Sequence, residues 1–494
     1  MITRRLVLAG LMAGAALPGW AEVMDSSPRP VARGRTPEAG KTTSKAAGGP
    51  GAEALIEAAK LGGTVAFVVA DAATGEVLEA REATTRLPPA SVAKAITSLF
   101  ALEKLGPGYR FTTRVLATGP VQGGIVQGDL VLLGGGDPTL QTDQLGDLVA
   151  RLAKTGLKGA TGRFLVWDGA LPRLSNITAD QPAHVGYDPA LSGLSLNFNR
   201  VYFEWKKANG DWQVGMDARG ERFLPEVRMI GAKVVKRESP LFTYDQAPGR
   251  EDWTVASAAL GKGGSRWLPV RQPAVYVAEV FCTLARAQGI TLPQGEVVAA
   301  RPSGTEIGRI DSDPLTAVLR DMLKFSTNIT AECVGLTASG QRDLAASGRV
   351  MSDWCKARLG MASSFADHSG LGSGSRITAA DMVKALVQSQ REGRGLKPIL
   401  RDVGMKDDKG KAIKDHPVKV LAKSGTLNFV SGLAGHIVPP GGREMVFAIF
   451  SGDPARRDAV PVALRESPEG GEGWTKRARR LQGQLISRWA GIYG

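Results

Sequence analysis

The sequence is poor in the side chains that bind metals or form covalent cross-links. Only three cysteines and four histidines occur in 494 residues. Three cysteines permit at most one internal disulfide and leave one thiol over, so a Cys333–Cys355 pair and buried free thiols both stay open. The histidines at positions 184, 368, 416 and 436 lack the spacing of metal ligands. This absence argues against a zinc peptidase, and we expect no metal.

Long apolar runs are also missing after the N-terminus. The run from Leu6 to Ala16 is too short to span a bilayer, and a membrane anchor would need more apolar length. It follows Arg4 and Arg5 and precedes a small-x-small site that ends at Ala21, which is typical of a cleaved secretory signal. We therefore expect residues 1–21 to be removed and the mature protein to be periplasmic. The paired arginines leave Sec and twin-arginine export both open.

The excess of basic residues is best explained as a basic solvated surface. The chain has 62 Lys and Arg against 48 Asp and Glu, a formal charge of +14. The basic residues are spread along the sequence, and an exported protein meets wall polymers and membrane surfaces more often than DNA. We expect no nucleic acid, and at most peripheral contact with membrane or wall polymers. Residues 22–50, rich in Pro, Gly, Ser and basic residues, are expected to be a flexible linker.

The pattern along the chain predicts a discontinuous α/β (α+β) architecture. At 494 residues the chain suggests two to four domains. Residues 118–303 read as β-rich inserted material with glycine turns, whereas 51–117 and 304–494 form one interrupted domain. Periodicity and turn residues predict a hairpin at 64–82, a helix from near 91 to 106, a helix ending at 156, a hairpin at 194–216, helix after 314, and strands before a closing helix.

Two similar strings, "LAKTG" at 152–156 and "LAKSG" at 421–425, differ in their context. Lys154 lies in the last turn of a predicted helix and Gly156 just beyond it, so helix termination explains the first string without any function. The second string precedes a predicted strand hairpin. Alternation along a strand places Ser424 and Thr426 on one face, and two hydroxyls beside Lys423 suit a substrate carboxylate.

Two further pairs carry candidate chemistry. Ser91 and Lys94 lie three residues apart at the start of a predicted helix, within reach of one another. The serine oxygen lies near the positive end of the helix dipole, and a desolvated lysine can accept its proton. Alone, the pair would be better explained as an N-cap serine with a solvated lysine. Ser326-x-Asn328 lies at a predicted helix-to-loop break, and Ser195-x-Asn197 matches the same pattern within the inserted region, which makes it the weaker candidate.

Together, "SVAK", "STN" and "KSGT" occur in the order of the three motifs of penicillin-recognising serine enzymes. With "GDLVLLGGGDPTL" and "DHSGLGSGSRIT" around them, the chain resembles the D-alanyl-D-alanine carboxypeptidase/endopeptidase family, the class C penicillin-binding proteins, from about 52 to 490. The resemblance implies a penicillin-binding-protein or serine β-lactamase-like transpeptidase fold with inserted domains, no cofactor, and two kinds of partner: peptidoglycan stem peptides and β-lactam antibiotics.

The resemblance also implies roles for the motif residues. Ser91 would be the nucleophile and Lys94 its base, with a pKa lowered by burial and by Lys423. Ser326 would relay a proton to the leaving amine. Asn328 would bind the substrate amide, and Ser424 and Thr426 would bind the substrate carboxylate. The whole segment from Lys423 to Thr426, including Gly425, would contact the substrate. The backbone N–H groups of Ser91 and Thr426 would stabilise the oxyanion.

Two departures and two alternative functions accompany this interpretation. Ser424 replaces the usual threonine, and Gly372 to Ser375 replaces a Ser-Arg-x-Asn stretch. A β-lactamase is the nearest alternative enzyme, but the class A Glu-x-x-Leu-Asn loop is missing. The other alternative is a catalytically idle wall-binding scaffold, against which the intact motifs argue. The balance of carboxypeptidase and endopeptidase action and the oligomeric state stay open.

Overall fold

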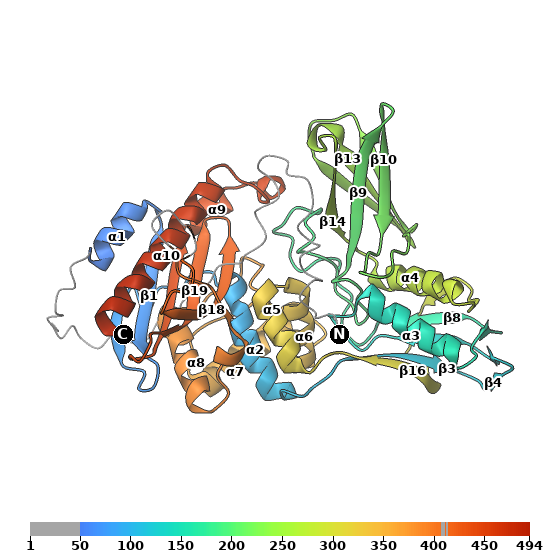
Figure 1. Cartoon of the computed structure of the whole chain (residues 1–494), viewed down its shortest axis with the longest axis horizontal. Helices are drawn as coiled ribbons and strands as arrows, with labels where there is room; N and C mark the ends of the chain where they lie inside the picture. Colours follow the sequence, from blue (N-terminus) through green and yellow to red (C-terminus); the bar gives the residue numbers. More distant parts are fainter. Residues whose placement is uncertain (1–49, 407–410, 412) are drawn as a thin grey trace. The chain divides into compact units, whose positions relative to one another are not determined.

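A computed structural model describes residues 50–406, 411 and 413–494, and the chain separates into two compact units (Figure 1). The inserted unit is Arg110–Asp313. The discontinuous unit comprises, among the described residues, 50–109 and Pro314–Gly494. The expected signal at 1–21 and all but the last residue of the expected linker at 22–50 lie outside the described residues.

The discontinuous unit is built on a six-stranded antiparallel sheet with the order β17-β18-β19-β20-β1-β2. Nearly every residue of its central strands is buried, which is typical of a sheet covered on both faces. Helix α10 packs on β19, and α8 packs on β20 and β1 (Figure 1). The strands are β1 Thr64–Asp71, β2 Val77–Arg81, β17 Arg401–Asp402, β18 Lys419–Leu427, β19 Val430–Val438 and β20 Met445–Gly452.

Helix α2, Ala93–Leu105, is the central helix of this unit. Its first nine residues are all buried, and it packs against α5, α6 and α7. It ends at Gly106, whose φ of 83° is readily adopted only by glycine. The other helices are α1 Ala52–Ala59, α5 Leu315–Phe325, α6 Asn328–Ser339, α7 Leu344–Leu359, α8 Ala379–Arg391, α9 Pro454–Asp458 and α10 Gly471–Tyr493, with 3-10 turns η2 Ala90–Val92, η4 Lys397–Ile399 and η5 Val462–Leu464.

The inserted unit has its own core and four sheets. The largest has the order β15-β8-β6-β3-β16, and helices α3 and α4 pack on one another and on its strands. The elements are β3 Thr112–Ala117, β4 Val121–Gln122, β5 Ile125–Val126, β6 Leu130–Leu133, α3 Thr142–Lys154, β7 Gly159–Ala160, β8 Phe164–Trp167, β9 Arg200–Ala208, β10 Asp211–Asp217, β11 Ile230–Val235, β12 Phe242–Ala247, β13 Arg250–Ala256, η3 Ser257–Ala259, β14 Gly263–Pro269, α4 Pro273–Ala287, β15 Gly295–Val297 and β16 Thr305–Asp311.

The first and last strands of the inserted unit pair with one another. Strand β3 lies antiparallel to β16 through six residue pairs, from Thr112 with Asp311 to Ala117 with Thr305. Both strands lie outside the range 118–303 that the sequence indicated. Their pairing joins segments far apart in the chain, so no local pattern assigns them to this unit.

Candidate active site

Ser91 lies in a tight turn that leads directly into α2. The 3-10 turn η2 carries it, and Ala90 just before it has φ 46°, a left-handed conformation that costs a non-glycine residue energy. The segment that follows Asp367 packs against this turn. A Cβ at Gly370 would lie 1.8 Å from the carbonyl oxygen of Ala90, so only glycine allows this approach. Ser91 is buried, with 8% of its surface exposed.

Lys94 lies one turn further along and is fully buried. Its Nζ donates to Ser91 Oγ at 2.9 Å, to Asn328 Oδ1 at 2.7 Å and to the carbonyl oxygen of Ser369 at 2.9 Å. An ammonium has three N–H donors, so these three acceptors satisfy it completely. The first two motifs of the sequence therefore meet at this nitrogen.

The electrostatics around Lys94 differ in part from the expectation. Burial lowers the pKa of the Lys94 ammonium, as the sequence interpretation held. The charges that act on this pKa are the carboxylates of Glu332 and Asp367, and both oppose the effect of burial. The sequence interpretation had also invoked Lys423, which is not among these charges, so its effect on the pKa of Lys94 stays a prediction.

Glu332 and Asp367 are the residues that the motif reasoning missed. Buried Glu332 accepts the backbone N–H of His368 at 3.0 Å and of Ser369 at 2.8 Å, and burial raises its pKa. Asp367 accepts two backbone N–H groups of the glycine-containing segment after it, one of them from Gly370 at 2.6 Å. Glu332 lies four residues after Asn328 on α6, and this spacing on one helix face was the available signal.

Ser326 lies at a break between two helices, whereas the sequence indicated a helix-to-loop break. Helix α5 ends at Phe325, Ser326 has φ 59°, and α6 begins at Asn328. This left-handed residue turns the chain so that Ser326 Oγ accepts a hydrogen bond from Lys423 Nζ at 3.0 Å. Two residues around the break between α5 and α6 thus contact the lysines: Ser326 contacts Lys423, and Asn328, the first residue of α6, contacts Lys94.

The third string lies on β18, which packs against η2. Lys423 and Ser424 are buried, with 1% and 3% exposed. In the described part of the chain, β17 pairs only with the residues before them, so the edge of β18 from Lys423 to Leu427 has no strand beside it there. Such an edge offers backbone groups to an extended peptide. Thr426 Oγ1 is buried and has no hydrogen-bond partner among the described residues.

The two rejected strings have structural explanations in the inserted unit. Lys154 is exposed in the last turn of α3, followed by Gly156 at φ 88°. Ser195 Oγ accepts a hydrogen bond from Asn199 Nδ2 at 3.1 Å, and residues 197–199 all have left-handed φ angles of 50–59°. Asn197 and Asn199 hydrogen-bond surrounding segments and so hold this unusual turn.

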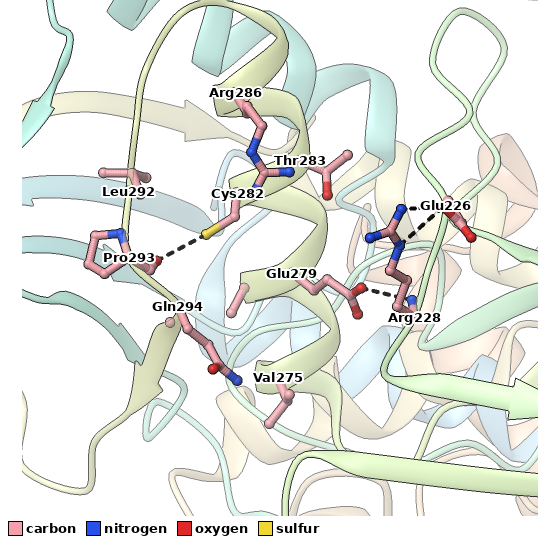
Figure 2. Close-up of a pocket in the computed structure, with 12 residues that line it drawn as sticks. Glu226, Arg228, Val275, Glu279, Cys282, Thr283, Arg286, Leu292, Pro293 and Gln294 are labelled. Atoms are coloured by element: carbon pink, nitrogen blue, oxygen red, sulfur yellow. Dashed lines mark hydrogen bonds and ion pairs between the residues drawn. The ribbon is translucent and has the colours of Figure 1, made fainter.

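A separate cavity of about 300 Å³ lies in the inserted unit, beside α4 (Figure 2). Its polar groups largely bind one another: Glu226 pairs with Arg228 at 3.0 Å, and Glu279 accepts the backbone N–H of Arg228 at 2.8 Å. The Cys282 thiol donates to a backbone carbonyl at 3.6 Å. None of the motif residues lines this cavity.

Cys282, Cys333 and Cys355 are all free thiols. Among residues 50–406, 411 and 413–494, no cluster of His, Cys, Asp and Glu has the arrangement to hold a metal ion. The same part of the chain contains no helix that is both long and apolar enough to cross a bilayer.

The site thus combines a buried serine–lysine pair, a second serine–lysine pair and an open strand edge, an arrangement compatible with a serine hydrolase. The chain belongs to the D-Ala-D-Ala carboxypeptidase 3 (S13) family, whose model matches residues 52–467. It is 28% identical to a D-alanyl-D-alanine carboxypeptidase of Actinomadura sp. (strain R39), with 85% of each chain covered. It is 23% identical to D-alanyl-D-alanine carboxypeptidase DacB of Haemophilus influenzae, with 79% of this chain and 85% of the relative covered.

The fold comparison agrees with this assignment. The crystal structure of penicillin binding protein 4 (dacB) from Haemophilus influenzae superposes with a TM-score of 0.71 at 19% identity. The alignment covers 89% of this chain and 99% of that one. The expected penicillin-binding-protein fold, a mixed helix and strand architecture with several sheets, is therefore confirmed.

Proposed function

We propose that the protein is a serine-type D-Ala-D-Ala carboxypeptidase and endopeptidase that acts on peptidoglycan stem peptides and cross-links in the periplasm. The observation that carries the proposal is the fully buried Lys94, whose Nζ lies 2.9 Å from Ser91 Oγ. Burial favours its neutral form, which is the form that can take a proton from the serine.

Acylation begins with Ser91. Its Oγ attacks the carbonyl carbon of the scissile bond while neutral Lys94 accepts the hydroxyl proton. The oxyanion that forms is stabilised by the backbone N–H groups of Ser91 and Thr426. Loss of one such donor typically lowers the rate about a hundredfold to a thousandfold.

Departure of the amine completes acylation. Ser326 passes a proton to the leaving nitrogen, the C–N bond breaks, and Lys423, bonded to Ser326 Oγ at 3.0 Å, replaces the proton that Ser326 gave up. Asn328 orients the substrate amide. Ser424 and Thr426 bind the carboxylate of the leaving residue, and Gly425 lets the peptide lie close to β18. Before deacylation Lys94 releases to solvent the proton that it took from Ser91, and Lys423 regains one from solvent. Water then attacks the ester, neutral Lys94 accepts a proton from this water, and Ser91 Oγ takes that proton back as the ester bond breaks.

The same chemistry opens a β-lactam ring. A penicillin presents a strained amide and a carboxylate in the arrangement of a D-Ala-D-Ala terminus, so Ser91 would become acylated without expelling a separate amine. A complex of the Haemophilus influenzae protein with a β-lactam, whose structure superposes with a TM-score of 0.69, supports this proposal.

The decisive experiment is labelling with a fluorescent penicillin, followed by mass spectrometry of the labelled peptide. We expect the label on Ser91 and none on Ser91→Ala. Ser98→Ala is the matched control, because Ser98 lies two turns along α2 and its hydroxyl donates to the carbonyl oxygen of Lys94. Full labelling of Ser91→Ala would overturn the proposal. Labelling without release of D-alanine from a peptide would favour the idle scaffold, and fast penicillin hydrolysis a β-lactamase.

A further inference from the structure

An arginine outside the three motifs contacts the carboxylate-binding end of the site. Arg401 lies on the two-residue strand β17, where its backbone position pairs with Ala422 of β18. Its side chain crosses to the motif, and Nη2 donates to Ser424 Oγ at 3.1 Å. Ser424 itself is buried. The contact therefore lies in a protected environment, where a hydrogen bond from a charged donor is strong.

The chemistry of the two groups determines the direction of the hydroxyl proton. A guanidinium has donors only, so Ser424 Oγ must accept the bond from Arg401. The hydroxyl hydrogen is then available for a second partner. A carboxylate is an acceptor only, and it matches the donor that Arg401 leaves on Ser424.

The contact between Arg401 and residue 424 has a specific consequence because residue 424 is a serine. The usual residue is threonine, whose branched Cβ restricts the side-chain rotation, whereas a serine hydroxyl turns more freely. The hydrogen bond from Arg401 restricts the rotation of the Ser424 hydroxyl, as the methyl group of a threonine would have done.

Another hydroxyl on the same strand face also favours an anion. Thr426, two residues after Ser424, has a buried hydroxyl without a hydrogen-bond partner among the described residues. A carboxylate at this place would accept a hydrogen bond from that hydroxyl.

We propose that Arg401 is a positioning residue that fixes Ser424 as a hydrogen-bond donor and so makes the site selective for leaving residues with a free carboxylate. This inference rests on the proposed function and deepens it. It adds a determinant of specificity from β17 to the three motifs.

The test uses one peptide in two forms, ending in D-Ala-D-Ala with a free carboxylate or with a carboxamide. For the full-length protein we expect the free acid to have the higher kcat/KM. Arg401→Gln should lower this acid-to-amide ratio about ten- to a hundredfold, the value of a hydrogen bond to a charged group, mainly through KM. Turnover of the amide should change less than about twofold.

Two further variants separate positioning from a loss of structure. Arg401→Lys keeps a donor and should retain part of the ratio, and Ser424→Thr in the Arg401→Gln background should restore part of it. Arg394→Gln is the matched control, because Arg394 is a surface arginine paired with Glu103 and Glu392. Its acid-to-amide ratio should equal that of the unmodified protein.

The outcomes separate a failure of the proposed function from a failure of the proposed role of Arg401. An unmodified protein that cleaves neither peptide would remove the proposed function. Cleavage of the acid with an unchanged ratio in Arg401→Gln would overturn the role of Arg401 alone. An equal loss for acid and amide would also overturn it, since that result indicates a structural effect.

Discussion

At the scale of single residues, the site depends on two buried lysines. Lysine is almost never fully buried unless its ammonium is paired. Lys94 meets this condition through three acceptors, and Lys423 through Ser326 Oγ among others. Burial lowers the pKa of Lys94, while Glu332 and Asp367 limit the shift. The balance of these effects sets the pH at which the proposed base becomes available.

Glu332→Gln should move the acid limb of the pH–rate profile to lower pH. The carboxylate of Glu332 raises the pKa of Lys94, so its removal leaves burial to lower that pKa further. Since the base must be neutral, acylation should then begin at a lower pH. The measurement is the second-order rate of acylation by a fluorescent penicillin across the pH range.

Asp381→Asn is the control for this variant. Asp381 is a buried carboxylate that accepts bonds from Ala362 and Ser363, and its pKa is also raised by burial. We expect its profile to coincide with that of the unmodified protein. A shift of the Glu332→Gln profile to higher pH would contradict our account of Lys94. Melting temperatures of both variants separate a pH effect from a loss of folding.

At the scale of helices and strands, local patterns predicted much of the discontinuous unit. The turn between two apolar runs predicted the β1–β2 hairpin, and Gly106 predicted the end of α2. The same holds for α3, whose end at Lys154 is followed by the left-handed Gly156. These features depend on residues close together in sequence, so periodicity and turn chemistry suffice to find them.

Features that depend on distant residues could not be predicted in this way. The glycines at 134–136 lie in the loop that leads from β6 to α3, where the backbone N–H of Gly134 donates to the Trp167 carbonyl and that of Gly136 to the Gly193 carbonyl. The contact of Gly370 with Ala90 and the contact of Arg401 with Ser424 likewise require the folded chain.

The two pairs of similar strings provide a test at this scale. Lys423→Ala and Ser326→Ala should each lower peptidase activity at least a hundredfold, a typical contribution of acid–base groups. Lys154→Ala and Ser195→Ala should leave activity nearly unchanged. The first removes an exposed charge at a helix end, and the second leaves Asn199 Nδ2 bonded to the Ala190 carbonyl at 2.9 Å.

The measurement is the steady-state release of D-alanine by all four variants, with thermal unfolding as the check on stability. Ser195→Ala should lose about 1 kcal/mol of stability, because one buried hydrogen bond is removed. Reversed effects on activity would mean that the wrong member of each pair had been assigned to the site.

At the scale of the whole molecule, the motif residues all belong to one unit, while the other unit adds a core of its own. The S13 family model spans residues 52–467, so it covers both units. All the residues to which we assign a role in the proposed acyl chemistry lie in the discontinuous unit. An additional folded unit of this size is therefore expected to contribute through substrate selection.

We predict that the enzyme prefers extended wall peptides to minimal ones. Binding energy from parts of the substrate far from the scissile bond can be used to stabilise the transition state, so a longer peptide gains in kcat/KM. A cross-linked muropeptide dimer with a diamino-acid stem should therefore exceed an uncrosslinked pentapeptide, and both should exceed an acylated D-Ala-D-Ala tripeptide. Initial rates for the three substrates at one ionic strength measure this order. Equal kcat/KM values would mean that remote contacts do not select the substrate, and the endopeptidase part of the proposed function would lose its support.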